Sequence, residues 1–306
     1  MDVNGRLAPT PSGYLHSGNA FNFLLTDYCV HRLQGTLRLR IDDLDATRVN
    51  EAYLSDIFDV LHWLEIPWEQ GPRKNAEHHA AYSQTHRRKT YDTFIERLIM
   101  TGRVYACSCS RASLKIAERC SCSRLQLALD TSETALRIST EHALIEFDDV
   151  WVGRCTIDLH EVMHDFVIRR KDGIPAYQIA SLADDLLYQT TLIVRGRDLL
   201  TSTAAQIWLG RLLDLPEFSK VSCYHHPLLT RANKQKLSKS AGDISLKYFI
   251  ETHQKSELFY QQLSPWFGLT PVANRRELHE QLDIQGGTAY LKTHFNNASF
   301  WLPDTR

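Results

Sequence analysis

The chain has 306 residues, of which 43% are hydrophobic and 23% are charged, so it can form two domains, or one domain with a large insertion. Its formal net charge of −1 at pH 7 excludes a global positive field and leaves only local basic patches for RNA contact. The sequence lacks both a run of 18 apolar residues and a charged leader with an apolar core, which favours a cytoplasmic protein without a membrane partner.

The first 42 residues predict a strand, a bend, a helix and a second strand. The strands are expected at residues 5–8 and 36–42. Between them, apolar side chains recur at helical spacing from Phe21 to Cys29, and Gly35 ends the helix. A strand that leads through a bend into a helix is typical of nucleotide-binding α/β units.

The bend, LAPTPSGYLHSGN at residues 7–19, predicts an anion site. Glycines let a backbone approach a ligand, and a helix N-terminus offers free N–H groups at the positive end of its dipole. We expect His16 to donate to a phosphate oxygen and Gly18 to leave room for a flat base. A plain strand-to-helix turn with an incidental histidine is the alternative.

The next segments predict two helices and then an interruption. Apolar residues at helical spacing place one helix over residues 53–64 and another over residues 80–100. From residue 105 to residue 165 the pattern breaks into clustered cysteines, a polar stretch and short strand-like runs. This segment is expected to be an insertion between two halves of an α/β unit.

Strands and helices alternate again after residue 165. Strands are expected at 165–170, 190–196 and 221–229, and helices at 176–187 and 201–215, the last one capped near Thr201 or Ser202. Residues 241–306 are expected to be mostly helical. The chain therefore predicts an α/β fold with a doubly wound parallel sheet, an inserted α+β subdomain and a short helical C-terminal region.

A second phosphate-suited element is KLSKS, from Lys236 to Ser240, which places two ammonium groups and two hydroxyls in five residues. Such a loop can clamp a triphosphate. A solvated basic loop fits the same residues when they are taken alone. The bend and this loop flank a doubly wound sheet, so both are expected to face the crevice beyond its strand ends.

Four of the seven cysteines fall in one short window with the spacing C-x-C-x10-C-x-C. Crowded thiols in a chain without a secretion signal favour a metal over disulfides. Four thiolates suit a closed tetrahedral zinc site. We therefore expect one structural Zn²⁺, with unliganded thiols as the alternative, at Cys107, Cys109, Cys120 and Cys122.

Taken together, these motifs resemble those of the class I aminoacyl-tRNA synthetases of the glutamyl/glutaminyl group. HSGN stands in the place of their HIGH signature and KLSKS in the place of KMSKS. Between them, RLAPTPSGYLH, LRIDDLD, YACSCSR, DFVIRRKDGIPAY and LIVRGRDLL follow the order and spacing of the group, from about Gly5 to Gly242. The resemblance implies the Rossmann-type catalytic domain of these enzymes.

The resemblance also implies the site residues and the reactants. The residues that would bind ATP, which comes with Mg²⁺, are His16, Gly18, Asn19, Lys236 and Lys239. Those that would bind the amino acid are Arg6, Ala8, Thr10, Asp42, Tyr177 and Arg195.

The length of the chain after KLSKS narrows the resemblance. Members of this group usually carry a large anticodon-binding region there, and residues 243–306 are too few for it. The chain therefore resembles the truncated members of the group, which are ligases that modify tRNA. They activate glutamate with ATP and attach it to queuosine in the anticodon of tRNA(Asp). We expect a monomer.

Three departures keep other readings open. The group's glutamyl enzymes usually have RIED where this chain has RIDD, so Asp42 leaves glutamine or another amino acid as an alternative substrate. Asn19 departs from the HIGH signature, and the zinc-binding tyrosine of the truncated members is missing before Cys120 and Cys122. A non-tRNA acceptor, or a catalytically inactive paralogue that binds tRNA or a protein, is a further alternative.

The expected division of the chain follows from these motifs. Residues 1–104 and 166–242 would form the two halves of the catalytic domain, the second with the KLSKS loop. Residues 105–165 would form the inserted zinc-knuckle subdomain, and residues 243–306 the helical C-terminal region without an anticodon-binding domain.

Overall fold

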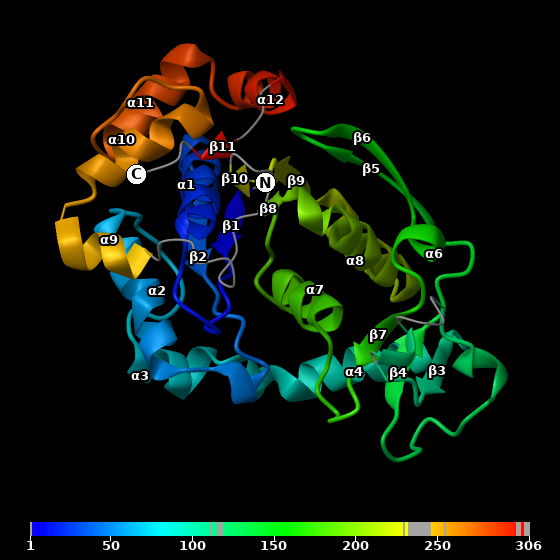
Figure 1. Ribbon diagram of the computed structural model, residues 1–306. Coiled ribbons are helices and arrows are strands. Elements are labelled where there is room, and N and C mark those ends of the chain that lie inside the picture. Colours follow the sequence, from blue (N-terminus) through cyan, green and yellow to red (C-terminus); the bar gives the residue numbers. More distant parts are fainter. Residues whose placement is uncertain are drawn as a thin grey trace.

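The computed structural model describes residues 2–110, 112–114, 119–228, 230–231, 246–253, 255–297 and 301–302. Its main sheet has six strands in the order β2-β1-β8-β9-β5-β6 (Figure 1). These strands are β1 (Asn4–Leu7), β2 (Thr36–Leu39), β5 (Leu144–Asp149), β6 (Gly153–Asp158), β8 (Leu192–Gly196) and β9 (Ser222–His226). Neighbouring strands are parallel except for the antiparallel pair of β5 and β6. The predicted α/β fold is confirmed.

Helices cover both faces of this sheet, as the doubly wound prediction requires. They are α1 (Ser17–Arg32), α2 (Glu51–Trp63), α7 (Tyr177–Leu187) and α8 (Leu200–Leu212). Successive side chains of a strand point to opposite faces. In β8, Leu192 and Val194 join the hydrophobic cluster that contains α1 and α2, whereas Ile193 joins the cluster that contains α7 and α8.

A second, antiparallel sheet lies apart from the first and has the order β3-β4-β7. Its strands are β3 (Val104–Cys107), β4 (Ala135–Ile138) and β7 (Phe166–Arg169). The remaining helices before the C-terminal region are α3 (Asn75–Glu77), α4 (Arg88–Ile99) and α6 (Leu159–Val162). Strands β5 and β6, which precede residue 165, belong to the main sheet, whereas β7, which follows it, belongs to the small sheet. The division of the chain into domains stays a prediction.

The predicted helix over residues 80–100 is wrong in its first part. A π-helical turn covers His78–Tyr82, a 3-10 turn covers Gln84–Arg87, and the α-helix α4 begins only at Arg88. Between the turns Ser83 is extended. The Asp43 carboxylate accepts hydrogen bonds from the Ser83 hydroxyl and from the Gln84 N–H. This contact with another segment breaks the helix that the local pattern predicts.

The expected cap of α8 near Thr201 or Ser202 is also wrong. A 3-10 turn at Arg197–Leu199 leads directly into α8, whose N-cap is Leu199. The Ser202 hydroxyl instead accepts a hydrogen bond from Gln178 Nε2 of α7. The Ser202 side chain, which residue type alone predicts to cap the helix, therefore binds a neighbouring helix instead.

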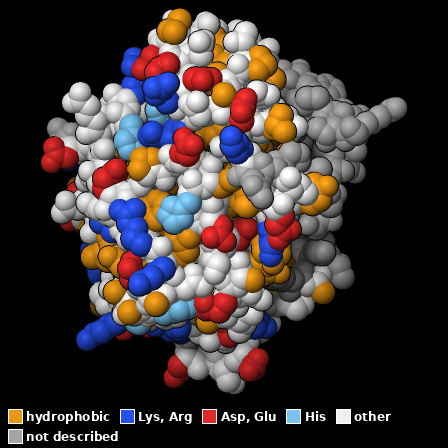
Figure 2. Space-filling view, turned by 90° about the vertical axis from the view of Figure 1, so that its left-hand side faces the viewer, with side chains coloured by type: hydrophobic (Ala, Val, Ile, Leu, Met, Phe, Trp, Pro, Cys, Tyr) orange, Lys and Arg blue, Asp and Glu red, His pale blue; other side chains and the backbone are white. Residues whose placement is uncertain are grey.

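The C-terminal region is helical, as predicted, and lies beside α1 at the top of Figure 1. Its elements are α9 (Leu246–His253), α10 (Glu257–Leu263), α11 (Arg275–Gln285), α12 (Thr288–Asn297) and β11 (Trp301–Leu302), which pairs with β10 (Thr230–Arg231). Figure 2 shows the left-hand side of the view in Figure 1, where the described basic and acidic side chains are interspersed. Within the described ranges, every helix is too short or too polar to cross a lipid bilayer.

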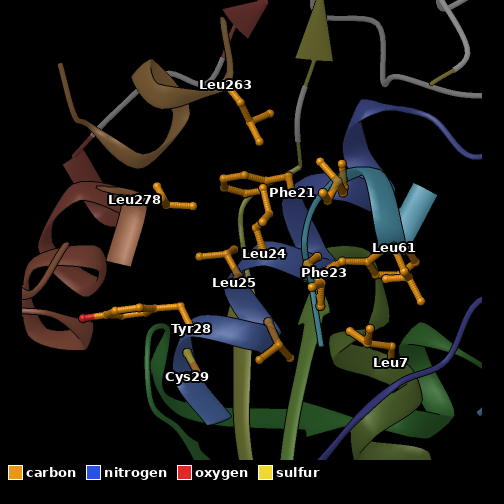
Figure 3. Packing of buried hydrophobic residues seen from close by; sticks show 14 of the residues in the cluster. Leu7, Phe21, Phe23, Leu24, Leu25, Tyr28, Cys29, Leu61, Leu263 and Leu278 are labelled. Carbon is orange, nitrogen blue, oxygen red and sulfur yellow. The ribbon is translucent and has the colours of Figure 1, made fainter. Parts of the chain in front are cut away.

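Helix α1 is the centre of the larger hydrophobic cluster. It is buried on most of its circumference, because the sheet packs on one side and the C-terminal helices on the other. Figure 3 shows Phe21 and Leu25 of α1 on the side of the helices that carry Leu263 and Leu278. A helix covered on so many sides gives its N-terminus a fixed position.

Asp27 of α1 is the polar link between this core and α11. Its fully buried carboxylate accepts two hydrogen bonds from Arg275, at 2.6 and 2.9 Å, and lies 2.8 Å from His279 Nε2 and 2.9 Å from His31 Nδ1. Burial alone would raise the pKa of Asp27, but hydrogen bonds from His279, His31 and Arg275 hold it well below its ordinary value.

We expect Asp27→Asn to lower the free energy of unfolding by about 3 kcal/mol near pH 5.5, because it leaves Arg275 without its buried partner. The hydrogen bond to Asp27 raises the pKa of His31. The stability from His31 is therefore complete below about pH 6.5 and is lost as the pH rises through the folded-state pKa. The stability that Asp27 contributes is complete above about pH 3.9 and is lost as the pH falls through its lowered folded-state pKa.

Urea denaturation at pH 5.5 and pH 9 measures this effect, with the exposed Asp59→Asn of α2 as the control. The loss caused by Asp27→Asn should be larger at pH 5.5. Equal losses at both pH values would show that His31 takes no part in the link.

Candidate functional site

A cavity of about 380 Å³ opens where β1 and β8 end. The strand order reverses between these adjacent parallel strands. From β1 the chain passes through α1 to β2 on one side, and from β8 it passes through α8 to β9 on the other side. In open α/β sheets, ligands bind in the crevice at such a switch point. The cavity is therefore the candidate site.

The cavity brings together most of the residues that the sequence singles out. Eight of the predicted site residues line it, namely Arg6, Ala8, Thr10, His16, Gly18, Asn19, Tyr177 and Arg195. The site prediction did not include the polar lining residues Asn22, Asp198 and His226. Asn22 Nδ2 lies 3.1 Å from His226 Nε2 and donates to the Val194 carbonyl oxygen. Asn22 and His226 carry no motif signal of their own, whereas Asp198 lies within the LIVRGRDLL motif.

His16 is the N-cap of α1 and closes a capping box. Its Nδ1 accepts a hydrogen bond from the Gly18 N–H at 3.1 Å, and the Asn19 Oδ1 accepts one from the His16 N–H at 3.0 Å. Asn19, a departure from the HIGH signature, thus has a structural role. Because Nδ1 accepts, the neutral ring carries its hydrogen on Nε2.

This cap changes how the helix start can meet an anion. The Gly18 N–H donates to the ring, and the Asn19 N–H donates to the His16 carbonyl oxygen at 2.8 Å. The helix dipole and the ring Nε2–H therefore remain the candidate contacts, rather than these two N–H groups. A Cβ at Gly18 would lie 2.9 Å from His16 Cε1, so the glycine makes room for the histidine ring. Its predicted contact with a flat base stays a prediction.

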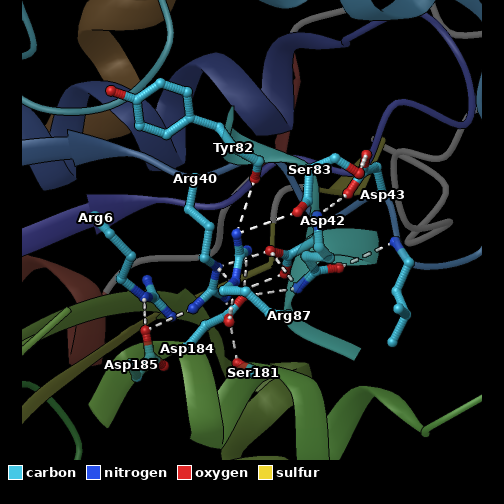
Figure 4. A network of polar contacts seen from close by, with 12 residues as sticks. Arg6, Arg40, Asp42, Asp43, Tyr82, Ser83, Arg87, Ser181, Asp184 and Asp185 are labelled. Atoms are coloured by element: carbon cyan, nitrogen blue, oxygen red, sulfur yellow. Dashed lines mark hydrogen bonds and ion pairs between the residues drawn. The ribbon is translucent and has the colours of Figure 1, made fainter. Parts of the chain in front are cut away.

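A network of buried charges supports the floor of the cavity (Figure 4). Asp185 Oδ1 accepts hydrogen bonds from Arg6 Nε at 3.1 Å and from Arg40 Nη1 at 2.8 Å. Its Oδ2 lies 3.6 Å from Arg195 Nη2. Burial alone would raise the pKa of Asp185, but Arg6, Arg40 and Arg195 hold it below its ordinary value.

Asp184, the other half of the aspartate pair, is held mainly by Arg87 and also lies 4.0 Å from Arg40 Nε. Its two carboxylate oxygens accept hydrogen bonds from Arg87 at 2.7 and 2.9 Å, and it also accepts from the Tyr91 hydroxyl at 2.8 Å. The site residues predicted from the sequence include neither Asp184 nor Asp185.

Asp42 lies beside the first cavity rather than in its wall. Both of its carboxylate oxygens accept hydrogen bonds from Arg40, at 2.7 and 3.1 Å. It lines a second cavity of about 860 Å³, which shares Thr10 and Tyr177 with the first. Its carboxylate is thus already committed to Arg40, and a contact with a substrate ammonium would add to that pair.

The four cysteines of the C-x-C-x10-C-x-C segment form one cluster. Their Sγ atoms all lie within 4.8 Å of one another, and a tetrahedral zinc–thiolate site needs sulfur–sulfur separations of about 3.8 Å. Cys107 Sγ also accepts a hydrogen bond from Arg137 Nε at 3.3 Å. The donor set and the spacing fit zinc. Cys107 and Cys109 also line the second cavity.

The KLSKS loop carries the two remaining residues that are predicted to bind ATP. Lys236 and Lys239 lie outside the described residues. Their predicted contact with the phosphates of ATP therefore stays a prediction.

Comparisons with known proteins agree with this geometry. The family model of the catalytic domain of class I tRNA synthetases (E and Q) matches residues 2–302. Glutamate–tRNA ligase 2 of Acidithiobacillus ferrooxidans is 35% identical over an alignment of 271 positions, which covers 81% of this chain and 54% of that protein. The glutamyl-Q tRNA(Asp) synthetase of Methylococcus capsulatus is 35% identical over 241 residues, which are 78% of this chain and 76% of that protein.

The fold agrees as well. The crystal structure of a glutamate tRNA ligase from Elizabethkingia meningosepticum, in complex with its amino acid, superposes with a TM-score of 0.75 at 22% identity. The match covers 99% of this chain and 68% of that one. The chain spans about half the length of curated glutamate–tRNA ligases that it matches. Since the family model matches nearly the whole chain, the protein belongs to the class I tRNA synthetases of the glutamate and glutamine group.

Proposed function

We propose that the protein activates glutamate with ATP and transfers the glutamyl group to queuosine in the anticodon of tRNA(Asp). The reactants are those implied by the sequence motifs. The glutamyl-Q tRNA(Asp) synthetase of Methylococcus capsulatus, which is 35% identical to this chain over 241 residues, supports the acceptor.

The observation that carries the amino-acid part is a charge imbalance in the floor of the cavity. Arg6, Arg40, Arg87 and Arg195 surround three carboxylates, those of Asp42, Asp184 and Asp185. Four guanidiniums against three carboxylates leave one positive charge without a partner within this group. Arg6 and Arg195 line the cavity, so a bound substrate carboxylate would restore the balance.

The proposed first step needs no protein nucleophile. An oxygen of the glutamate α-carboxylate attacks the α-phosphorus of ATP in line, the bond to the bridging oxygen breaks, and pyrophosphate leaves. Arg6 and Arg195 would hold the amino acid, and the His16 Nε2–H would donate to a phosphate oxygen at the N-terminus of α1. Lys236 and Lys239 would close over the phosphates. Mg²⁺ would enter with ATP and neutralise phosphate charge.

In the second step, a hydroxyl of the acceptor attacks the carbonyl carbon of the adenylate, and AMP leaves. We infer that the acceptor approaches through the second cavity, because that cavity meets the first at Thr10 and Tyr177. Arg170, which pairs with Asp45 and Asp172, lines this cavity together with Lys171, which donates to the Ser108 carbonyl oxygen. Both would contact backbone phosphates in addition to these partners.

We also propose that the cysteine cluster binds one structural Zn²⁺ through Cys107, Cys109, Cys120 and Cys122. Zinc would tie the turn at Cys122–Arg124 to the end of β3. It would thereby hold the wall of the second cavity rather than take part in the reaction.

ATP–pyrophosphate exchange measured with each amino acid tests the activation step. Glutamate should support exchange in the absence of tRNA, and glutamine and aspartate should give less than about 1% of that rate. If glutamine alone supported exchange, the substrate would be glutamine, and the aspartate at position 42 would mark that change of substrate. Exchange with none of the amino acids would favour the catalytically inactive alternative.

We expect Gly18→Ala to raise the KM for ATP about tenfold, because the new Cβ displaces the His16 ring and opens the capping box, at a cost of about 1 kcal/mol. The KM for glutamate should change less than about twofold. Exchange kinetics measure both constants, and the neighbouring Ser17→Ala is the control. An unchanged KM for ATP would remove His16 from the nucleotide site.

A further inference from the structure

Arg195 is connected to a chain of buried polar side chains that the proposed mechanism does not use. Its Nη1 lies 3.2 Å from the Thr203 hydroxyl, which lies 3.0 Å from His225 Nε2. The His225 Nδ1 lies 2.6 Å from Asp149 Oδ2. Arg195, Thr203, His225 and Asp149 are all at most 3% exposed.

The hydrogen-bonding capacities of these groups give the chain a direction. Arg195 can only donate, so the Thr203 oxygen accepts from it. The Asp149 carboxylate accepts from the Nδ1–H of His225, which leaves Nε2 of a neutral ring as an acceptor for the Thr203 hydrogen. The Leu199 carbonyl oxygen lies 3.2 Å from the same hydroxyl and is also within hydrogen-bonding reach of the His225 ring, so it is a second acceptor at this junction. Burial lowers the pKa of His225, which favours the neutral ring.

The far end of the chain is anchored to the sheet. Asp149 Oδ1 accepts from the backbone N–H groups of Trp151, Val152 and His225, at 3.0, 2.8 and 3.3 Å. Asp149 ends β5 and pairs with Cys223 of β9. The pairing of β5 with β9 thus brings a residue from the segment predicted as an insertion behind the candidate site.

At the other end of this series of hydrogen bonds, the Arg195 guanidinium has no charged hydrogen-bond partner in the described part of the chain. The Nε of Arg195 is buried without a hydrogen-bond partner among the described residues. Its ion-pair partner Asp185 lies 3.6 Å away, beyond hydrogen-bonding distance. The remaining contacts are neutral, with Gln206 Oε1 at 2.8 Å and the Ser181 hydroxyl at 3.4 Å. The orientation of Arg195 therefore depends on neutral acceptors such as Thr203.

We propose that Asp149, His225 and Thr203 form a hydrogen-bonded relay that positions Arg195 to receive the carboxylate of the amino acid. The relay rests on the proposed function only for the identity of that ligand. Asp149 fixes the His225 ring, His225 orients the Thr203 hydroxyl, and Thr203 fixes the plane of the guanidinium. None of the three touches the substrate, so they are positioning residues.

The matched substitutions Thr203→Val and Thr203→Ser test the positioning. Valine removes the hydroxyl at nearly constant volume, whereas serine keeps it. We expect Thr203→Val to raise the KM for glutamate in ATP–pyrophosphate exchange about tenfold, as for the loss of one charge-assisted hydrogen bond. The KM for ATP of Thr203→Val should stay close to that of the parent. The midpoint of thermal unfolding of Thr203→Ser should also stay close to that of the parent. Equal effects of both variants, or an equal rise in the KM for ATP, would overturn the proposal.

Nitrogen NMR of the ¹⁵N-histidine-labelled protein tests the relay without any substrate. The expected spectrum of His225 is that of a neutral ring with its hydrogen on Nδ1, and Thr203→Val should shift the Nε2 signal. A hydrogen on Nε2, or an Nε2 signal that Thr203→Val does not move, would overturn the relay. If the parent shows this spectrum but no exchange with glutamate, the proposed function fails while the relay stands.

Discussion

Replacing Arg195 with lysine is expected to raise the KM for glutamate about 100-fold, which corresponds to about 2.7 kcal/mol, and to leave the KM for ATP within about twofold. Lysine keeps the positive charge but loses the planar fork that holds a carboxylate through two hydrogen bonds. It also loses the paired contacts that Arg195 makes with Thr203 and Gln206. The effect should therefore exceed that of any single neighbour.

Steady-state exchange kinetics measure both constants. Arg211→Lys, an exposed position on α8, is the control and should behave as the parent does. A parallel rise in both KM values would indicate a general loss of structure, and an unchanged KM for glutamate would place the substrate carboxylate elsewhere.

Replacing Cys107 or Cys122 with serine is expected to reduce the zinc content from about one ion per chain to nearly none, and to lower the midpoint of thermal unfolding by roughly 10 °C. Both side chains are buried in the cluster, and a hydroxyl is a poor zinc ligand. Without the ion, the turn after residue 119 loses its main link to β3.

Metal analysis by mass spectrometry and differential scanning calorimetry measure the two effects. Cys155→Ser, on β6 outside the cluster, should keep its zinc. A parent that is free of zinc after purification in its presence, or serine variants that keep the ion, would contradict the zinc proposal.

The sequence was most informative where short motifs sit at the ends of elements. The alternation from residue 5 to residue 42 predicted β1, α1 and β2, and the cavity at the end of β1 contains residues from the bend between them. Arg195 lies on β8, in a segment predicted as a strand. In both cases local periodicity fixes an element, and the topology of a parallel sheet then brings its end to the site.

The partners of these residues could not be predicted in the same way. Arg40 meets Asp185 across 145 residues, and Asp149 meets His225 across 76 residues. A sequence shows that such groups exist but not which ones the fold brings together. Asp43 shows the same limit, because its hydrogen bond to the Gln84 N–H breaks a helix that periodicity alone predicts.

The most direct test of the proposed function is the transfer of radiolabelled glutamate to purified tRNA(Asp) with and without queuosine. The account predicts that label appears only on the tRNA that carries queuosine, requires ATP, and is released by mild alkali as expected for an ester. Label on tRNA that lacks queuosine, or label that resists alkali, would contradict it.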